Sequence, residues 1–171
     1  SWDYATRPRM RLSLNYTEEI RANLAEDNPV DAGATMGRYL EWTLGSVCES
    51  METPISCTLD GTNTLAEFYA PLVKRFRDKL KSGARTHRLV QAFADFEQAT
   101  IFRNYCVHWK NEFSPFTTPE MEAVFNKWME IQGMLYCAGC KSFVGYESNG
   151  SIEYVRCSCG ILDLKMDEYY S

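Results

Sequence analysis

The stretch MGRYLEWTLGSVCESM, from Met36 to Met51, decides the fold class of this 171-residue chain. Its apolar side chains recur at intervals of three and four residues, as they do in a helix that buries one face. These side chains are Met36, Tyr39, Leu40, Leu44, Val47, Cys48 and Met51. Asp31 precedes the stretch and is predicted to cap its start. The sequence therefore predicts a long, half-buried helix here.

The same spacing predicts four further helices on either side of this one. They cover residues 17–26, residues 64–80, a segment that begins near residue 86, and residues 117–133. Pro71 lies inside the second of these and marks either a bend or the true start of that helix. Four or five packed helices form a bundle of ordinary size, so we expect a mainly α fold.

The character of the chain changes after the last predicted helix, where cysteines appear in pairs. CAGC at residues 137–140 is followed seventeen residues later by CSCG at residues 157–160. A predicted β-hairpin with its turn at Asn149-Gly150 lies between the pairs. Two thiolate pairs at the base of a hairpin are typical of a zinc ribbon, although C-x-C departs from the commonest spacing. We predict a structural zinc ion bound by Cys137, Cys140, Cys157 and Cys159, with redox or unrelated cysteines as the alternative.

These patterns predict two domains, a helical one at residues 1–135 and a zinc ribbon at residues 136–171. The second is too small to bury a core of its own, so its metal should hold the fold rather than do chemistry. Its three basic residues stand against five acidic ones, which disfavours a strong grip on phosphate.

The segment RNYCVH, from Arg103 to His108, carries the chemistry of the chain. Histidine titrates close to neutrality and can move a proton between two oxygens, and arginine presents a planar fork of donors to phosphate. Asn104 lies four residues before His108 and would share its helical face. Because RNA brings its own 2′-hydroxyl nucleophile, these three side chains are sufficient for RNA cleavage without a metal.

The pattern R-N-x-x-x-H resembles the signature of the HEPN superfamily, α-helical domains many of which are metal-independent endoribonucleases of toxin–antitoxin, abortive-infection and CRISPR-type defence systems. The resemblance covers these six residues and their helical context. It implies that Arg103 and His108 are the catalytic pair, that Asn104 supports them, and that catalysis needs no cofactor. It also implies a homodimer whose two motifs face one another, and an ATPase, nucleotidyltransferase or antitoxin as a further partner.

A run of positive charge precedes this motif. Seven basic residues between Lys74 and Arg88 stand against one acid, Asp78. A solvated helix face and loop would explain the run as well as a positive rim that guides RNA, transfer RNA among the candidates, toward the motif. The predicted RNA contacts are Lys74, Arg75, Arg77, Lys81, Arg85 and Arg88. We expect His87, beside them, to be a surface residue rather than a second catalytic histidine.

The composition is that expected of a cytoplasmic protein. Cysteines paired as metal ligands, with three others unpaired, favour a reducing compartment. The sequence carries neither a signal peptide nor an apolar run long enough to span a bilayer, so no membrane partner is predicted. The chain begins at Ser1 rather than at Met, which indicates a piece of a longer protein.

The predicted function is therefore metal-independent RNA cleavage in stress or phage defence. Two other classes of function remain open at this point. One is a non-catalytic interaction module that dimerises or docks a partner such as an ATPase, and the other is a nucleic-acid-binding zinc ribbon with a helical spacer.

Overall fold

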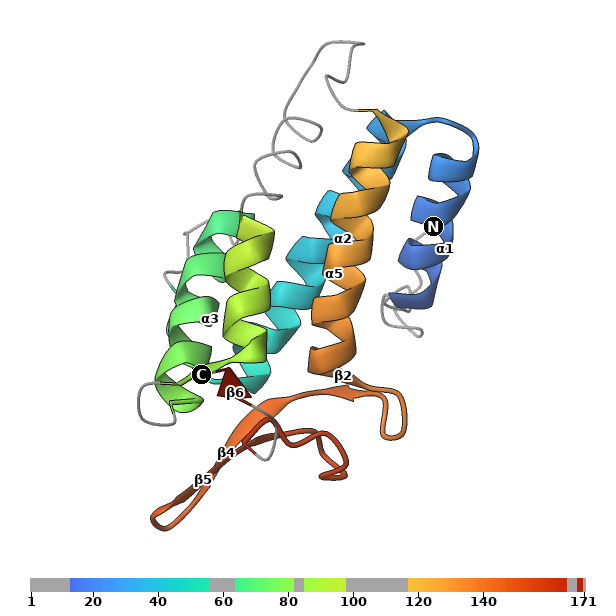
Figure 1. Cartoon of the computed structure of the whole chain (residues 1–171). Helices are drawn as coiled ribbons and strands as arrows, with labels where there is room; N and C mark the ends of the chain where they lie inside the picture. The colour runs from blue at the N-terminus through green and yellow to red at the C-terminus, as the bar shows by residue number, and fades with distance from the viewer. Residues whose placement is uncertain (1–12, 56–63, 82–84, 98–116, 166–168, 171) are drawn as a thin grey trace.

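The computed structural model describes residues 13–55, 64–81, 85–97, 117–165 and 169–170. Within these segments the helices run alongside one another, and the β elements of the C-terminal part lie across one end of the bundle (Figure 1). The predicted mainly α fold with a small C-terminal β module is confirmed.

The helices are α1 (Ser13–Ala25), α2 (Pro29–Ser50), α3 (Leu65–Lys79), a helical segment at residues 88–97, and α5 (Thr118–Leu135). Each corresponds to a helix predicted from the sequence, with ends shifted by a few residues. The long helix α2 contacts α1, α3 and α5, so it is the centre of the bundle.

The start of α2 differs from the prediction. Asn28, and not Asp31, is the N-cap residue, because its side-chain oxygen accepts a hydrogen bond of 3.2 Å from the Asp31 N–H. Pro29 takes the first helical position, where a missing N–H costs nothing. The pair Asn28-Pro29 thus ends one helix and begins the next. Every member of the predicted apolar stripe from Met36 to Met51 is buried.

Capping boxes begin α3 and α5. The N–H of Thr64 donates to the Glu67 carboxylate, and the N–H of Thr117 donates to the Glu120 carboxylate at 2.8 Å. Pro71 lies inside α3, so the alternative in which it starts that helix is wrong.

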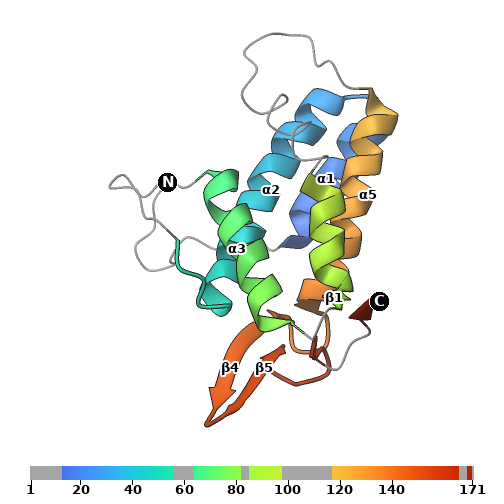
Figure 2. The same ribbon diagram turned by 60° about the vertical axis from the view of Figure 1, so that its left-hand side comes forward.

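The helix at residues 88–97 begins two residues later than predicted, because Thr86–His87 forms strand β1 instead. This strand pairs antiparallel with β6 (Tyr169–Tyr170), which brings the C-terminal segment back to the helical part of the chain (Figure 2). His87 is only 1 % exposed, so its prediction as a surface residue is wrong. Its ring Nδ1 accepts a hydrogen bond of 3.1 Å from the Leu89 N–H, at the start of the helix.

The core lies between α2, α3, residues 88–97 and α5, and aromatic rings fill it. Phe76 of α3 stacks on Phe93, with ring centroids 5.9 Å apart. Trp128 of α5 is fully buried and contacts both Phe96 and Tyr39. Rings of this size contribute much of the buried apolar area that holds the bundle together.

The β module contains β2 (Tyr136–Cys137), β3 (Ser142–Phe143), β4 (Gly145–Asn149) and β5 (Ile152–Arg156). Strand β2 pairs with β3 and β4 pairs with β5, both antiparallel. The predicted hairpin is confirmed, but its first strand is divided between the two sheets. Gly150 has a φ of +62° in the turn, a conformation that glycine adopts without strain.

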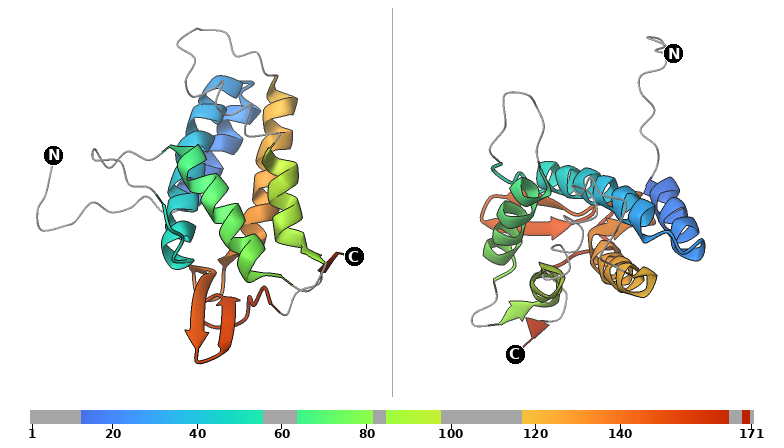
Figure 3. Two further views of the ribbon diagram at one scale, coloured as in Figure 1. Left: turned by 90° about the vertical axis from the view of Figure 1, so that its left-hand side faces the viewer. Right: turned by 90° about the horizontal axis from the view of Figure 1, so that it is seen from above.

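The hairpin of β4 and β5 projects beyond the end of α3, as the left view of Figure 3 shows. Among the described residues, no helix is both long enough and apolar enough to cross a membrane.

Candidate metal centre and basic surface

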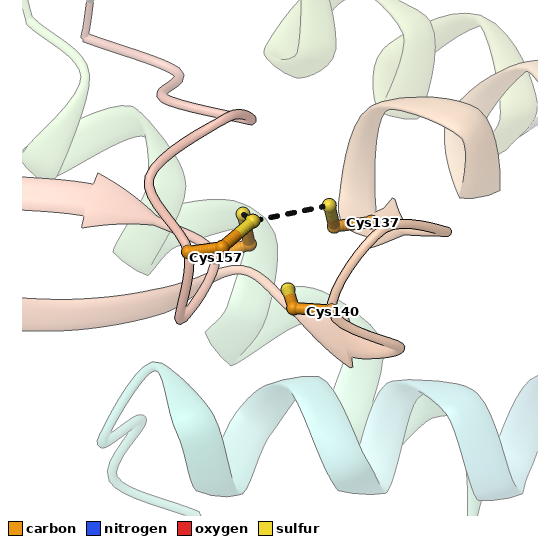
Figure 4. Close-up of side chains that lie close together, drawn as sticks. Cys137, Cys140 and Cys157 are labelled. Atoms are coloured by element: carbon orange, nitrogen blue, oxygen red, sulfur yellow. Dashed lines mark hydrogen bonds between the residues drawn. The ribbon is translucent and has the colours of Figure 1, made fainter.

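The structure brings the four predicted metal ligands together. The Sγ atoms of Cys137, Cys140, Cys157 and Cys159 all lie within 4.8 Å of one another. Cys137 ends strand β2 and Cys140 follows in the next turn, whereas the other pair follows strand β5. Figure 4 shows the side chains from these two loops converging.

Both loops use backbone conformations that turn the chain sharply. Lys141 follows the first cysteine pair with a φ of +56°, and Gly160 follows the second with a φ of +74°. The N–H of Gly160 donates to the Cys157 carbonyl at 2.9 Å, and the N–H of Cys157 donates to the Leu162 carbonyl at 2.9 Å. These bonds close the second loop around its cysteines.

The sulfur separations match a tetrahedral zinc site. The Sγ atom of Cys159 lies 3.7 Å from that of Cys137 and 3.4 Å from that of Cys157. Four sulfurs bonded to zinc at about 2.3 Å stand about 3.8 Å apart at the corners of a tetrahedron. The cluster could therefore hold a structural zinc ion without large movements of the chain.

Hydrogen bonds shift the pKa values of the cysteine thiols in both directions. The Leu162 N–H donates to the Cys157 sulfur at 3.3 Å. The Ser142 hydroxyl, 3.1 Å from the Cys140 sulfur, lowers the pKa of that thiol to about 6. The Ile161 N–H acts in the same direction on Cys159, but Cys157 and Cys140 outweigh it and raise the pKa of Cys159 to about 12. The Cys140 thiol is thus acidified, whereas the Cys159 thiol is made less acidic. A divalent cation that binds the cluster would displace the proton of Cys159.

The cluster offers four protein ligands, so a bound zinc ion would have no open position for a substrate. Cys137 and Cys157 are buried, whereas Cys140 is half-buried and Cys159 is exposed. A closed site of four thiolates is the arrangement of structural zinc.

The predicted RNA contacts divide into two groups. Exposed side chains are found at Lys74, Arg77, Lys81, Arg85 and Arg88. Arg75 is half-buried: its Nε donates to the Met51 carbonyl at 3.0 Å, and its guanidinium lies 4.7 Å from the centroid of the Tyr146 ring. Arg75 thus joins α3 to the end of α2 and to the β module.

Two surface grooves border the exposed basic residues. One has a volume of about 520 Å³ and includes Lys74 and two prolines, Pro54 and Pro71, in its wall. The other, of about 400 Å³, lies between residues 88–97 and α5 and carries both signs of charge.

Sequence reasoning missed the contacts between the β module and α3. Lys79 of α3 pairs with Glu153 of β5, with 2.6 Å between Nζ and Oε1. Tyr146 of β4 joins the same pair through its hydroxyl. No local pattern could have indicated a contact between side chains 74 residues apart.

The predicted catalytic residues Arg103, Asn104 and His108 lie outside the described residues. Comparison of the chain with models of protein families, with curated proteins and with solved structures finds no match. The resemblance of the motif to the HEPN signature therefore rests on its own residues.

Proposed function

We propose that the protein is a metal-independent endoribonuclease of the HEPN type whose C-terminal zinc ribbon stabilises the fold. The observation that carries the proposal is the sequence from Arg103 to His108, which combines a phosphate-binding cation with a proton carrier. The mainly helical fold of the described segments is the fold class that the resemblance implies. We expect the protein to act in the cell as a toxin or an anti-phage effector.

In the proposed reaction, His108 takes the proton of a 2′-hydroxyl, whose oxygen attacks the adjacent phosphorus. Arg103 stabilises the negative charge that builds on the phosphorane, and Asn104 orients the reacting groups. The bond between phosphorus and the 5′-oxygen then breaks, and an imidazolium returns a proton to that oxygen. The products are a 2′,3′-cyclic phosphate and a 5′-hydroxyl.

The basic surface supports an RNA substrate. Five cations among the described residues from α3 to the start of the helical segment at residues 88–97 are exposed, namely Lys74, Arg77, Lys81, Arg85 and Arg88. The ion pair of Lys81 with Asp78 spans 3.7 Å between exposed side chains, so it competes only weakly with a phosphate.

The β module is a poor candidate for nucleic-acid binding by itself. Arg156 pairs with Glu147 at 2.8 Å, and Lys165 pairs with Glu153 at 3.6 Å. Two of its three cations are thus engaged within the module, which argues against the alternative of a zinc-ribbon reader.

The proposal is tested by incubating the purified protein with total RNA in magnesium-free buffer after brief EDTA treatment, with a zinc assay to verify that the thiolate site stays loaded. Arg103→Ala and His108→Ala are each expected to lose at least about a hundredfold in cleavage rate. Arg38→Ala is the matched control, because this exposed arginine of α2 lies outside the basic surface and pairs with Glu19. It should cleave at the wild-type rate.

The ends of the products provide an independent readout, because the mechanism requires cyclic phosphates that resist phosphatase until the ring is opened. Cleavage that persists in both variants, or that needs added magnesium, would remove the assignment. Specific activity that falls on dilution, together with a dimer seen by light scattering, would support a site completed by two chains.

A further inference from the structure

We infer that metal binding at the four cysteines fixes the C-terminal half of α3, so that the β module acts as a metal-dependent clamp on the helical bundle. This inference rests on the zinc site proposed above and is independent of ribonuclease activity. Three sets of contacts carry it: the anchor at Val144, the grip on α3 and the connection of both to the cysteines.

Val144 anchors the module to two helices at once. Its N–H donates to the Leu135 carbonyl at the end of α5, and its carbonyl accepts from the Ser50 hydroxyl at the end of α2, both at 2.8 Å. The side chain of Val144 is fully buried. The next residue, Gly145, passes so close to α2 that an added Cβ would lie 3.0 Å from the Ser50 carbonyl oxygen.

Tyr146 and Glu153 form the grip on α3. The Tyr146 ring lies 4.2 Å from the Lys79 Nζ and 4.7 Å from the Arg75 guanidinium, measured to its centroid. Its hydroxyl accepts a hydrogen bond from Lys79 at 3.1 Å and donates to Glu153 at 2.6 Å. The Lys79 side chain, which is only 19 % exposed, also forms a direct ion pair with Glu153 at 2.6 Å. Two cations one helical turn apart are thus held by one hairpin.

The cysteine loops hold that hairpin in place at its base. Strand β5 leads directly into Cys157, and Ser142 of β3 contacts the Cys140 sulfur at 3.1 Å. The Ser142 hydroxyl also accepts hydrogen bonds from the Ser158 N–H and hydroxyl, at 3.3 and 3.1 Å. The two cysteine loops therefore meet at one side chain beside the metal ligands.

The described residues of the module bury only a small apolar core. Among the described residues of the module, the fully buried apolar side chains outside the cysteine loops are Val144, Val155 and Leu164. A segment of about 35 residues with so small a core depends on metal or on its neighbours for order. Loss of the metal should therefore increase the mobility of the hairpin and weaken its contacts with Arg75 and Lys79 of α3.

Hydrogen–deuterium exchange of the full chain tests the clamp, with zinc content measured by native mass spectrometry. Removing zinc with a chelator should speed exchange of residues 73–80 about tenfold or more, while residues 118–126 of α5 serve as the internal reference. In the zinc-loaded state, Glu153→Gln should speed exchange of residues 73–80 about threefold without losing zinc.

Glu147→Gln is the matched control. Glu147 lies on the same hairpin and also forms an ion pair, but its partner Arg156 belongs to the module. This variant should leave exchange of residues 73–80 unchanged. The inference is overturned if the protein binds no zinc, or if both glutamine variants act alike. Unchanged exchange in α3 after zinc loss, while the module itself opens, overturns it too. If zinc removal speeds exchange along the whole chain, the test is the comparison of Glu153→Gln with Glu147→Gln in the zinc-loaded state.

Discussion

Replacing Gly145 with alanine tests how tightly the β module is seated on the bundle. The new Cβ would lie 3.0 Å from the Ser50 carbonyl oxygen and 3.6 Å from the Ser50 Cβ. A carbon needs a few tenths of an ångström more than 3.0 Å from a backbone oxygen, so β4 must move away from α2. That movement also stretches the 2.8 Å hydrogen bond from the Ser50 hydroxyl to Val144.

The magnitude follows from these contacts. Forcing one methyl group into a packed contact costs about 1–3 kcal/mol, and weakening one hydrogen bond costs about 0.5–1.5 kcal/mol. The alanine restricts the unfolded chain and so returns about 0.5–1 kcal/mol. We therefore expect Gly145→Ala to lower the free energy of unfolding by about 1–3 kcal/mol.

Gly133→Ala is the matched control, with the opposite sign expected. Gly133 lies in α5 with no atom within 4 Å of its added Cβ, and alanine favours the helix by about 0.5–1 kcal/mol. Urea unfolding of zinc-loaded protein, followed by circular dichroism and tryptophan fluorescence, measures both variants. With a slope of about 2 kcal/mol/M, Gly145→Ala should move the midpoint down by about 0.5–1.5 M urea. A midpoint for Gly145→Ala at or above wild type, beside the expected gain for Gly133→Ala, would refute the tight seating.

Three further predictions follow from the cysteines and the cations. Cys137→Ser should reduce bound zinc from about one ion per chain to none, whereas Cys48→Ser should keep the ion, as metal analysis of both proteins will tell. Burial raises the pKa of the Cys48 thiol to about 11, so the thiol ionises at lower pH in the unfolded state than in the folded state. The free energy of unfolding should therefore fall by about 2 kcal/mol as pH rises from 9 to 11. In Cys48→Ala, the free energy of unfolding should fall less between pH 9 and pH 11, by the amount attributed to the thiol. A fall as large as in the wild type would contradict the raised pKa of Cys48. Lys74→Ala and Arg77→Ala should each reduce the salt dependence of RNA binding by about 0.7 in log–log slope, while Arg38→Ala on α2 should leave it unaltered.

Local patterns in the sequence were sufficient for most of the fold. The apolar spacing in α2 reports which face is buried, because helix geometry alone places those residues on one side. The capping boxes of α3 and α5 each span four residues, so signals of this kind are local features of the sequence. The start of α2 was misplaced because Asn28-Pro29 stops one helix and starts another with the same two residues.

The cysteine cluster was predictable because its ligands are paired in sequence, whereas the contacts around it were not. His87 shows the difference, since nothing beside it in the sequence indicates that a strand from residues 169–170 pairs with its own. The grip of Glu153 on Lys79 is likewise a product of the tertiary fold. Long-range contacts between polar side chains leave no periodic trace in either partner segment.

The cations of α3 illustrate why a run of like charge in a sequence is not a patch in space. Successive residues in a helix are 100° apart, so Arg75 and Lys79 share one face, while Lys74 and Arg77 lie on the far side. The first pair contacts Tyr146 of the β module, and the second pair is exposed. One helix therefore connects the β module to the proposed RNA surface. Substitutions on its two faces should therefore have different effects. Substitutions of Arg75 or Lys79 should alter hydrogen exchange in α3, whereas substitutions of Lys74 or Arg77 should alter RNA affinity.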